Sequence, residues 1–229
     1  MGIELKRFDY GMDPWADLPV LFRKKPAKIV FDVGANCGQT SIQLSKLFPN
    51  ANLWAFEPNP NIFPQLKQNT APLKQVTALP MALGNRQTNM TLHITGSHLN
   101  TSLLNYTRED GTDRVVENVE VPVDTLDHFC QQHHIDSIDL LKTDVQGYDK
   151  QVLEGARELF EKNRVHAVFC EINIHKIYED QCTFEEVYSY LTQFGFRLSG
   201  LYDLIREESF HIHWFDALFI RPEHFPKRI

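Results

Sequence analysis

Along most of the chain, short apolar runs typical of strands are followed by segments whose apolar residues have the spacing of a helix. Residues 28–33 form an apolar run that breaks at Gly34, and apolar residues spaced for a helix follow over 38–48. Unbroken apolar runs of roughly four to eight residues are typical of strands that a doubly wound sheet buries on both faces. The repeated pattern predicts an α/β fold with about seven core strands. The further strands are expected at 53–56, 75–79, 138–143, 165–172, 196–202 and 213–220, and the further helices at 62–69, 150–162 and 184–194.

The middle of the chain follows a different pattern, in which apolar and polar residues take turns. This alternation covers 90–94 and 119–123 and predicts half-exposed strands, which we expect to pair as a hairpin. Residues 96–113 between them are rich in Ser, Thr, Asn and Asp, as a surface loop would be. We therefore expect one domain with an inserted hairpin and a candidate lid. The expected bounds are 1–229 for the domain, 1–27 for an amino-terminal extension and 86–123 for the insertion.

The composition is that of a globular protein, and its charge argues against a nucleic-acid partner. Hydrophobic residues make up 42% of the chain and charged residues 23%, which excludes a disordered or fibrous class. The 23 Lys and Arg against 30 Asp and Glu give a net charge of −7, which would repel a phosphate backbone. No apolar run approaches the roughly 18 residues that span a bilayer, and the amino terminus has no signal-peptide core. The four scattered cysteines suit reduced thiols. We expect a cytoplasmic protein with no membrane span; the sequence indicates no oligomeric state.

In an open α/β sheet, ligands bind beyond the carboxyl ends of the strands. The first such loop is 32–38, in which Gly34 and Gly38 let the backbone approach a ligand before a helix starts. Asn36 stands where a dinucleotide fingerprint needs its second glycine, which weakens a pyrophosphate cradle. Glu57 ends the second strand, where a carboxylate can accept both hydroxyls of a ribose. Taken separately, the glycine loop would fit a tight turn and Glu57 an exposed acid. Their combination favours a binding site for an adenosine-containing ligand that needs no pyrophosphate.

Six short segments carry motifs that recur together in one enzyme family: Phe31 to Ser41, Ala55 to Pro58, Ala82 to Asn85, Val123 to Asp127, Leu140 to Asp149 and Phe215 to Ile220. Together they resemble the FkbM-type methyltransferases, which depend on S-adenosylmethionine. Many methyltransferases share the glycine loop, whereas the block from Lys142 to Asp149 is much more specific. The resemblance covers roughly residues 29 to 222. It implies the seven-stranded, Rossmann-like class I fold and O-methylation of a hydroxyl on a sugar or other polar small molecule.

The chain departs from this family's pattern at one position of the specific block. Relatives usually carry a glutamate before the glycine, and here Gln146 stands in its place. If that acid ligates a metal or takes a proton in relatives, Asp144 or Asp149 must take over here.

The loop, the strand ends and the resemblance together assign the cofactor contacts. We expect Asp32, Gly34 and Asn36 around the methionine portion of S-adenosylmethionine and Glu57 on its ribose. The adenine is expected against Met81 and Ala82, after the third strand. The full set of expected contacts is Asp32, Gly34, Ala35, Asn36, Gly38, Glu57, Pro58, Met81, Ala82 and Asp144.

A hydroxyl acceptor must lose a proton, and two acids end neighbouring strands near the reacting methyl group. Asp144 and Glu171 fit three roles: general base, ligand of the acceptor hydroxyl, or shared site of a hard divalent cation such as Mg²⁺. A helix cap at Asp144 and an ion pair between Glu171 and Lys142 stay open as structural alternatives. His98 in the candidate lid is a further possible base, although a solvated histidine fits as well. The candidate catalytic residues are Asp144, Glu171, Lys142 and His98.

Two other functions compete with methyl transfer. A nicotinamide-dependent oxidoreductase would use the same sheet, but the missing second glycine and the absence of a Tyr-x-x-x-Lys pair speak against it. A non-catalytic module that only binds the nucleoside is opposed by the intact Asp144 and Glu171. Methylation of a protein stays open. The polar loop 96–113 favours a polar small-molecule acceptor, for which a glycoside is one candidate.

Overall fold

The computed structural model describes residues 11–107, 113–206 and 210–225, which fold around a seven-stranded sheet. Its strands are β1 (Ile29–Val33), β2 (Asn52–Phe56), β3 (Val76–Leu79), β7 (Ile138–Thr143), β8 (Val165–Asn173), β9 (Arg197–Arg206) and β10 (Ile212–Ile220). They lie in the order β3-β2-β1-β7-β8-β10-β9. All run in one direction except β10, which is antiparallel to both β8 and β9. The predicted fold class and its seven core strands are confirmed.

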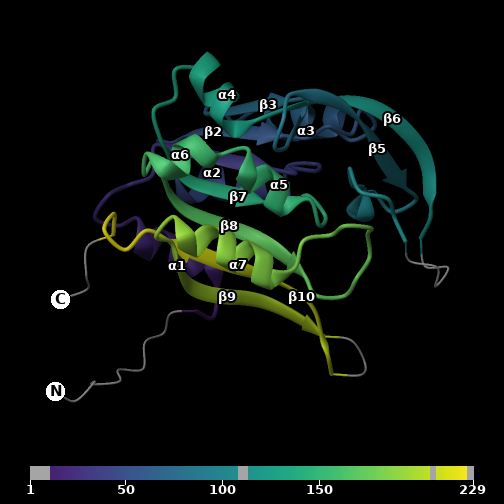
Figure 1. The fold of residues 1–229 in the computed structure, drawn as a ribbon. Coiled ribbons are helices and arrows are strands. Elements are labelled where there is room, and N and C mark those ends of the chain that lie inside the picture. The colour runs from purple at the N-terminus through teal and green to yellow at the C-terminus, as the bar shows by residue number, and fades with distance from the viewer. Residues whose placement is uncertain (1–10, 108–112, 207–209, 226–229) are drawn as a thin grey trace.

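Helices cover both faces of this sheet (Figure 1). One face carries α1 (Pro14–Leu21), α2 (Gln39–Leu47) and α3 (Phe63–Thr70), and the other carries α4 (Leu126–Gln132), α5 (Asp149–Glu154), α6 (Arg157–Glu161) and α7 (Phe184–Gln193). Leu44 of α2 packs in one core cluster with Leu53, and Val152 of α5 in the other with Phe31. Burial on both faces explains why the strands read as continuous apolar runs. Within the described residues, no helix is both long enough and apolar enough to cross a bilayer.

A smaller sheet lies between β3 and β7 in the chain and contains the predicted hairpin. It consists of β4 (Ala82–Leu83), β5 (Thr88–Thr95) and β6 (Val115–Asp124), with β6 in the centre. β5 and β6 are antiparallel and place Met90 opposite Val121. A short 3-10 turn, η1 (His98–Asn100), follows β5. The loop predicted at 96–113 includes 108–112, which lie outside the described residues.

The helix predicted at 150–162 is in fact two short helices, α5 and α6. Gly155 ends the first, and a Cβ atom there would overlap the carbonyl oxygen of Gly84, next to β4. The chain therefore passes directly against the inserted segment at this point. A single-sequence pattern could not show this, because the interfering residue lies far away in the sequence.

The amino-terminal extension contains α1, which the hydrophobic pattern did not indicate. Asp13 caps this helix by accepting a hydrogen bond from the backbone N–H of Trp15, and Pro14 occupies its first turn. Pro19 inside the helix obscured the apolar spacing. Tyr202 of β9 donates its hydroxyl to Asp17 Oδ2 at 3.0 Å, which fastens the helix to the sheet.

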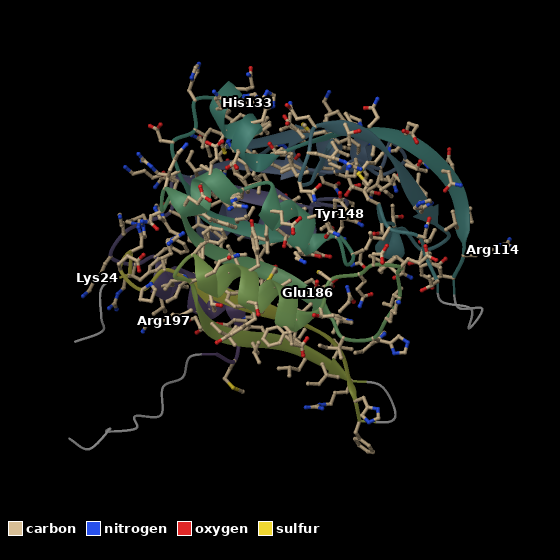
Figure 2. The ribbon with its side chains drawn as sticks, viewed as in Figure 1. Lys24, Arg114, His133, Tyr148, Glu186 and Arg197 are labelled. Carbon is tan, nitrogen blue, oxygen red and sulfur yellow. The ribbon has the colours of Figure 1, made fainter. Side chains whose placement is uncertain are left out.

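Asp139, at the start of β7, ties strands together at the amino edge of the sheet. Its Oδ2 accepts hydrogen bonds from the backbone N–H groups of Lys28 and Ile29, at 2.7 and 3.0 Å. His166 of β8 lies 3.1 Å from its Oδ1 and stacks on His224. In Figure 2, Lys24 and Arg197 lie at the left, on the side of this edge, and Arg114 lies at the right, beside the inserted sheet. Most of the predicted site residues lie at the opposite, carboxyl edge of the sheet.

Candidate active site

A cavity of about 490 Å³ opens at the carboxyl edge of the sheet, between the strand ends and the inserted segment. This volume is within the range of roughly 300 to 1,000 Å³ found for small-molecule sites. Residues from the ends of β1, β2, β7 and β8 line it, together with the start of β10. Of the predicted cofactor contacts, Gly34, Asn36, Glu57, Pro58, Met81, Ala82 and Asp144 line the cavity, whereas Asp32, Ala35 and Gly38 do not.

The glycine loop after β1 is a tight backbone structure that only glycine permits at its first turn. Gly34 has a φ of +80°, and a Cβ atom there would overlap the backbone carbonyl oxygen of Asp144. The N–H groups of Gly34 and Ala35 both donate to the carbonyl oxygen of Phe56, at 3.0 and 2.9 Å. The loop is thus clamped between the ends of β2 and β7, with its backbone facing the cavity.

Glu57 is held at the end of β2 by two backbone hydrogen bonds. Asn36 N–H donates to its Oε2 and Asn59 N–H to its Oε1, each at 2.8 Å. The side chain lines the cavity although the residue is only 7% exposed. Burial raises the pKa of Glu57 to about 7, against the opposing effect of the two amides. Each oxygen keeps a further lone pair, so the geometry fits a ribose, and this contact stays a prediction.

Asp32 lies behind the lining residues rather than among them. It is completely buried, accepts a hydrogen bond from Ser41 Oγ on Oδ2, and lies 3.4 Å from Lys142 Nζ through Oδ1. Lys142 does line the cavity. Asp32 therefore contacts Lys142, which lines the cavity, but does not reach the cavity itself. This position does not suit the predicted contact of Asp32 with the methionine portion of the cofactor.

The two predicted acids meet on one side of the cavity, formed by Lys142, Asp144, Gln146 and Glu171, which is the predicted acceptor side. Gln146 Nε2 lies 3.0 Å from Asp144 Oδ1 and 2.8 Å from Glu171 Oε2, so one amide joins both. Lys142 Nζ lies 3.3 Å from Asp144 Oδ2. Among the described residues Lys142 pairs with Asp32 and Asp144 and not with Glu171, and α5 starts at Asp149 without a side-chain cap. Neither structural alternative for the acids is formed.

Electrostatics separates the roles of the charged groups. Burial, reinforced by the negative charges of Asp144 and Asp216, raises the pKa of Glu171 well above its usual range. Burial acts against the charge of Lys142, but Asp144 and Asp32 outweigh it and raise the Lys142 pKa. Lys142 is therefore a fixed cation, while the raised pKa makes the Glu171 carboxylate a stronger base than an ordinary glutamate.

Only part of the candidate lid, residues 96–113, reaches the cavity. Of its polar side chains, those of Asn100, Thr101 and Ser102 line the cavity, while Ser97 and Asn105 do not. Ser102 Oγ donates to the carbonyl oxygen of Gln146 at 2.8 Å, which attaches this loop to the acceptor side. His98 begins η1, and its side chain lies outside the part of the chain that the structure describes.

Two further lining residues, His213 and Trp214, come from β10 and were missed from the sequence. β10 is antiparallel to β8, so its first residues lie at the same edge as the last residues of β8, and Trp214 faces Asn173 in register. The sequence pattern predicts the strand at 213–220 that contains both residues. It does not show that this strand is antiparallel to its neighbours, which is what places their side chains at the cavity.

The family model described as "Methyltransferase FkbM domain" matches residues 32–198, most of the chain. The chain belongs to the FkbM methyltransferase family. It is a methyltransferase that depends on S-adenosylmethionine, as expected from the motifs, and the oxidoreductase alternative is wrong. The cavity fits this cofactor, because about 490 Å³ is open beside Gly34 and the Glu57 carboxylate that lines it offers acceptors for ribose hydroxyls. A shared Mg²⁺ site at Asp144 and Glu171 gains no support, since the Gln146 amide lies between them.

Known proteins similar to this FkbM methyltransferase support the assignment. The 2-O-methyltransferase NoeI of Sinorhizobium fredii is 27% identical over 189 residues, which cover 75% of this chain and 74% of NoeI. The hexuronic acid methyltransferase AglP of Haloferax volcanii is 26% identical over 149 residues, 63% of this chain and 56% of AglP.

Solved structures share the fold of this FkbM methyltransferase at low sequence identity. Magnesium protoporphyrin IX methyltransferase of Synechocystis, with bound S-adenosylmethionine, gives a TM-score of 0.51 at 12% identity, over 90% of this chain and 75% of the other. An rRNA methylase of Streptococcus thermophilus gives 0.51 at 12% identity, over 91% and 97%. These likenesses establish the class I methyltransferase fold alone.

Proposed function

We propose that this FkbM methyltransferase transfers a methyl group to a hydroxyl oxygen of a sugar or another polar small molecule, such as a glycoside. The observation that carries the proposal is the half-buried Glu171 carboxyl, which lines the cavity beside Asp144 and has a raised pKa. The names of two relatives support it, since one is a 2-O-methyltransferase and the other acts on a hexuronic acid. The proposal includes the sequence-based expectations of a cytoplasmic location and no nucleic-acid partner.

Bound beside Gly34 and Glu57, S-adenosylmethionine would supply an electrophilic methyl group and a neutral thioether leaving group for substitution at the acceptor oxygen. The Glu171 carboxylate would take the proton that this hydroxyl loses. Asp144 accepts a second hydrogen bond from the acceptor, while Lys142 balances its charge. Enclosure in the cavity supplies proximity and excludes water.

The other residues on the acceptor side are suited to a polar ligand. Asn100, Thr101 and Ser102 of the lid and Asn173 at the end of β8 offer hydrogen-bond donors and acceptors to the cavity. Trp214 adds an apolar ring face, which a sugar ring can cover with its C–H groups. This mixture of polar groups and an aromatic ring surface favours a polyhydroxylated acceptor over a wholly apolar one.

The test is a methyl-transfer assay with isotope-labelled S-adenosylmethionine on a panel of sugars, uronic acids, glycosides, polyketides and peptides. Glu171→Gln keeps the shape of the side chain but removes the base, so we expect turnover to fall by about a hundredfold or more. Cofactor affinity, measured by calorimetry, should change little. The matched control is Glu158→Gln on the exposed side of α6, where the carboxylate forms an ion pair with Lys162.

An undiminished rate in Glu171→Gln, with Glu158→Gln behaving as wild type, would contradict the role of Glu171. Turnover on apolar acceptors alone would contradict the substrate class.

A further inference from the structure

Gln146 has an unusual position and uses every polar group of its side chain. Its backbone φ is +54°, in the left-handed region, directly before Gly147. An amide nitrogen carries two N–H groups, and here one donates to Asp144 Oδ1 at 3.0 Å and the other to Glu171 Oε2 at 2.8 Å. The nitrogen of this amide therefore lies between the two carboxyl groups.

The opposite end of the same residue is attached to the lid side of the cavity. Tyr178 Oη lies 3.1 Å from Gln146 Oε1 and 3.1 Å from the carbonyl oxygen of Asn100, so its hydroxyl proton has two acceptors. Ser102 Oγ donates to the backbone carbonyl of Gln146. Because carboxylates only accept hydrogen bonds, the two acids determine that the nitrogen end of the amide faces them.

Two ionised carboxylates this close repel each other unless a proton, a cation or a hydrogen-bond donor lies between them. A divalent cation does this by binding oxygens at roughly 2.0 to 2.6 Å, and it must occupy the space between them. In this chain the Gln146 amide occupies that space, and Lys142 contributes the positive charge from the far side of Asp144. We propose that Gln146 is a positioning residue that takes the place of a bridging divalent cation, so that turnover requires none. This inference rests on the proposed hydroxyl methyl transfer.

The same contact selects which oxygen of Glu171 serves the acceptor. Gln146 Nε2 and Asn173 Nδ2 both donate to Oε2, at 2.8 and 3.1 Å. Oε1 is then the oxygen oriented to take the proton of the acceptor hydroxyl. Removing the amide frees the Glu171 carboxyl group to rotate. The rate of methyl transfer then falls, although no residue proposed to contact the methyl group has been removed.

The first test measures cation binding directly and needs no acceptor. Gln146→Glu places a third carboxylate beside Asp144 and Glu171, a set of oxygens that suits a hard divalent cation. We expect this variant to bind Mn²⁺ at least about tenfold more tightly than wild type, by calorimetry and electron paramagnetic resonance. Gln132→Glu, on the exposed end of α4, adds the same charge away from the site and should match wild type.

The second test uses turnover. Wild-type activity should be unchanged by EDTA, whereas the activity of Gln146→Glu should fall with EDTA and return with added Mn²⁺. Gln146→Leu, which fills the space without donating, should lose about tenfold or more in kcat and gain nothing from Mn²⁺. Melting temperature and cofactor affinity identify any variant that fails to fold.

The pH profile separates positioning from a loss of structure. Glu171 faces Asp144 and Lys142 from the β7 side, Asp216 from β10 and Asp149 from α5. Without the amide, the repulsion from Asp144 is unrelieved, so the ascending limb of the profile of Gln146→Leu should move to higher pH. A merely structural role would lower the rate at every pH alike.

Tight Mn²⁺ binding by the wild type, or its inactivation by EDTA, would overturn the proposal. So would Mn²⁺ binding by Gln146→Glu no tighter than by Gln132→Glu. If no acceptor of the tested classes is methylated, the proposed function fails, but the cation-binding comparison still decides the role of Gln146.

Discussion

The two sides of the cavity are built in different ways. On the side proposed to hold the cofactor, called the cofactor side below, Glu57 is fixed by backbone N–H groups, one of them only two residues away, and Gly34 by close approach of the chain itself. On the acceptor side, side chains distant in the sequence hold one another, as Gln146 does with Glu171 and Tyr178. A backbone cradle has one shape, whereas a side-chain network is adjustable. We therefore expect substitutions on the first side to change binding and those on the second to change the rate.

The largest effect should come from Gly34→Ala, which tests the rigidity of the cofactor side. The added Cβ would overlap the backbone of Asp144 at a φ of +80°, and no side-chain movement relieves this. We expect cofactor affinity to fall by about a hundredfold or more, together with a lower melting temperature. Gly11→Ala is the matched control, because Gly11 has a φ of +95° but nothing within 4 Å of its Cβ position. Equal effects in the two variants would mean that φ strain alone is responsible.

On the acceptor side, Asp144→Asn should lower turnover by about a hundredfold and change cofactor affinity little. It should also shift the pH profile. The negative charge of Asp144 contributes to the raised pKa of Glu171, so its removal lowers that pKa. The base is then deprotonated at lower pH, and the ascending limb should move in the acidic direction. An unmoved limb would show that another group titrates.

A smaller effect is expected for Glu57→Gln, which tests the ribose assignment. The amide keeps the volume but replaces one acceptor oxygen by a donor, so it disturbs the backbone hydrogen bonds and the predicted ribose contact. We expect cofactor affinity to fall by at least about tenfold, with kcat at saturating cofactor nearly unchanged. Calorimetry against the reaction product S-adenosylhomocysteine measures this. Unchanged affinity in a folded variant would remove Glu57 from the ribose.

The smallest effect concerns stability and is predicted for Asp149→Asn. Asp149 is completely buried beside the acceptor side but does not line the cavity, and burial raises its pKa to about 7. A raised acid pKa stabilises the fold below the unfolded-state pKa, and this contribution is lost as pH rises through the folded value. Wild type should thus lose stability between about pH 6 and pH 8, and the variant should lose about 1 kcal/mol less. Denaturant titrations of both proteins at the two pH values give the comparison.

The difference between the two sides also explains what the sequence could predict. Glu57 and the glycine loop were found because a strand end, a turn and an acid are local signals. Gln146 was noticed as a departure from a motif, but its partners Glu171 and Tyr178 lie 25 and 32 residues away, and no pattern indicates that they meet. The break at Gly155 has the same cause, since the chain that it contacts belongs to the inserted segment.

The most direct test of the account is the position of the transferred methyl group. The protein would be incubated with ¹³C-methyl-labelled S-adenosylmethionine and each acceptor that turns over, and the product would be analysed by two-dimensional NMR. We expect a methyl ether on a hydroxyl oxygen of a polyhydroxylated acceptor, formed at a rate that falls about a hundredfold in Glu171→Gln. A methyl ester on a carboxylate, or a methyl group on nitrogen or sulfur, would contradict it, because none of these acceptors needs the hydroxyl proton removed by Glu171.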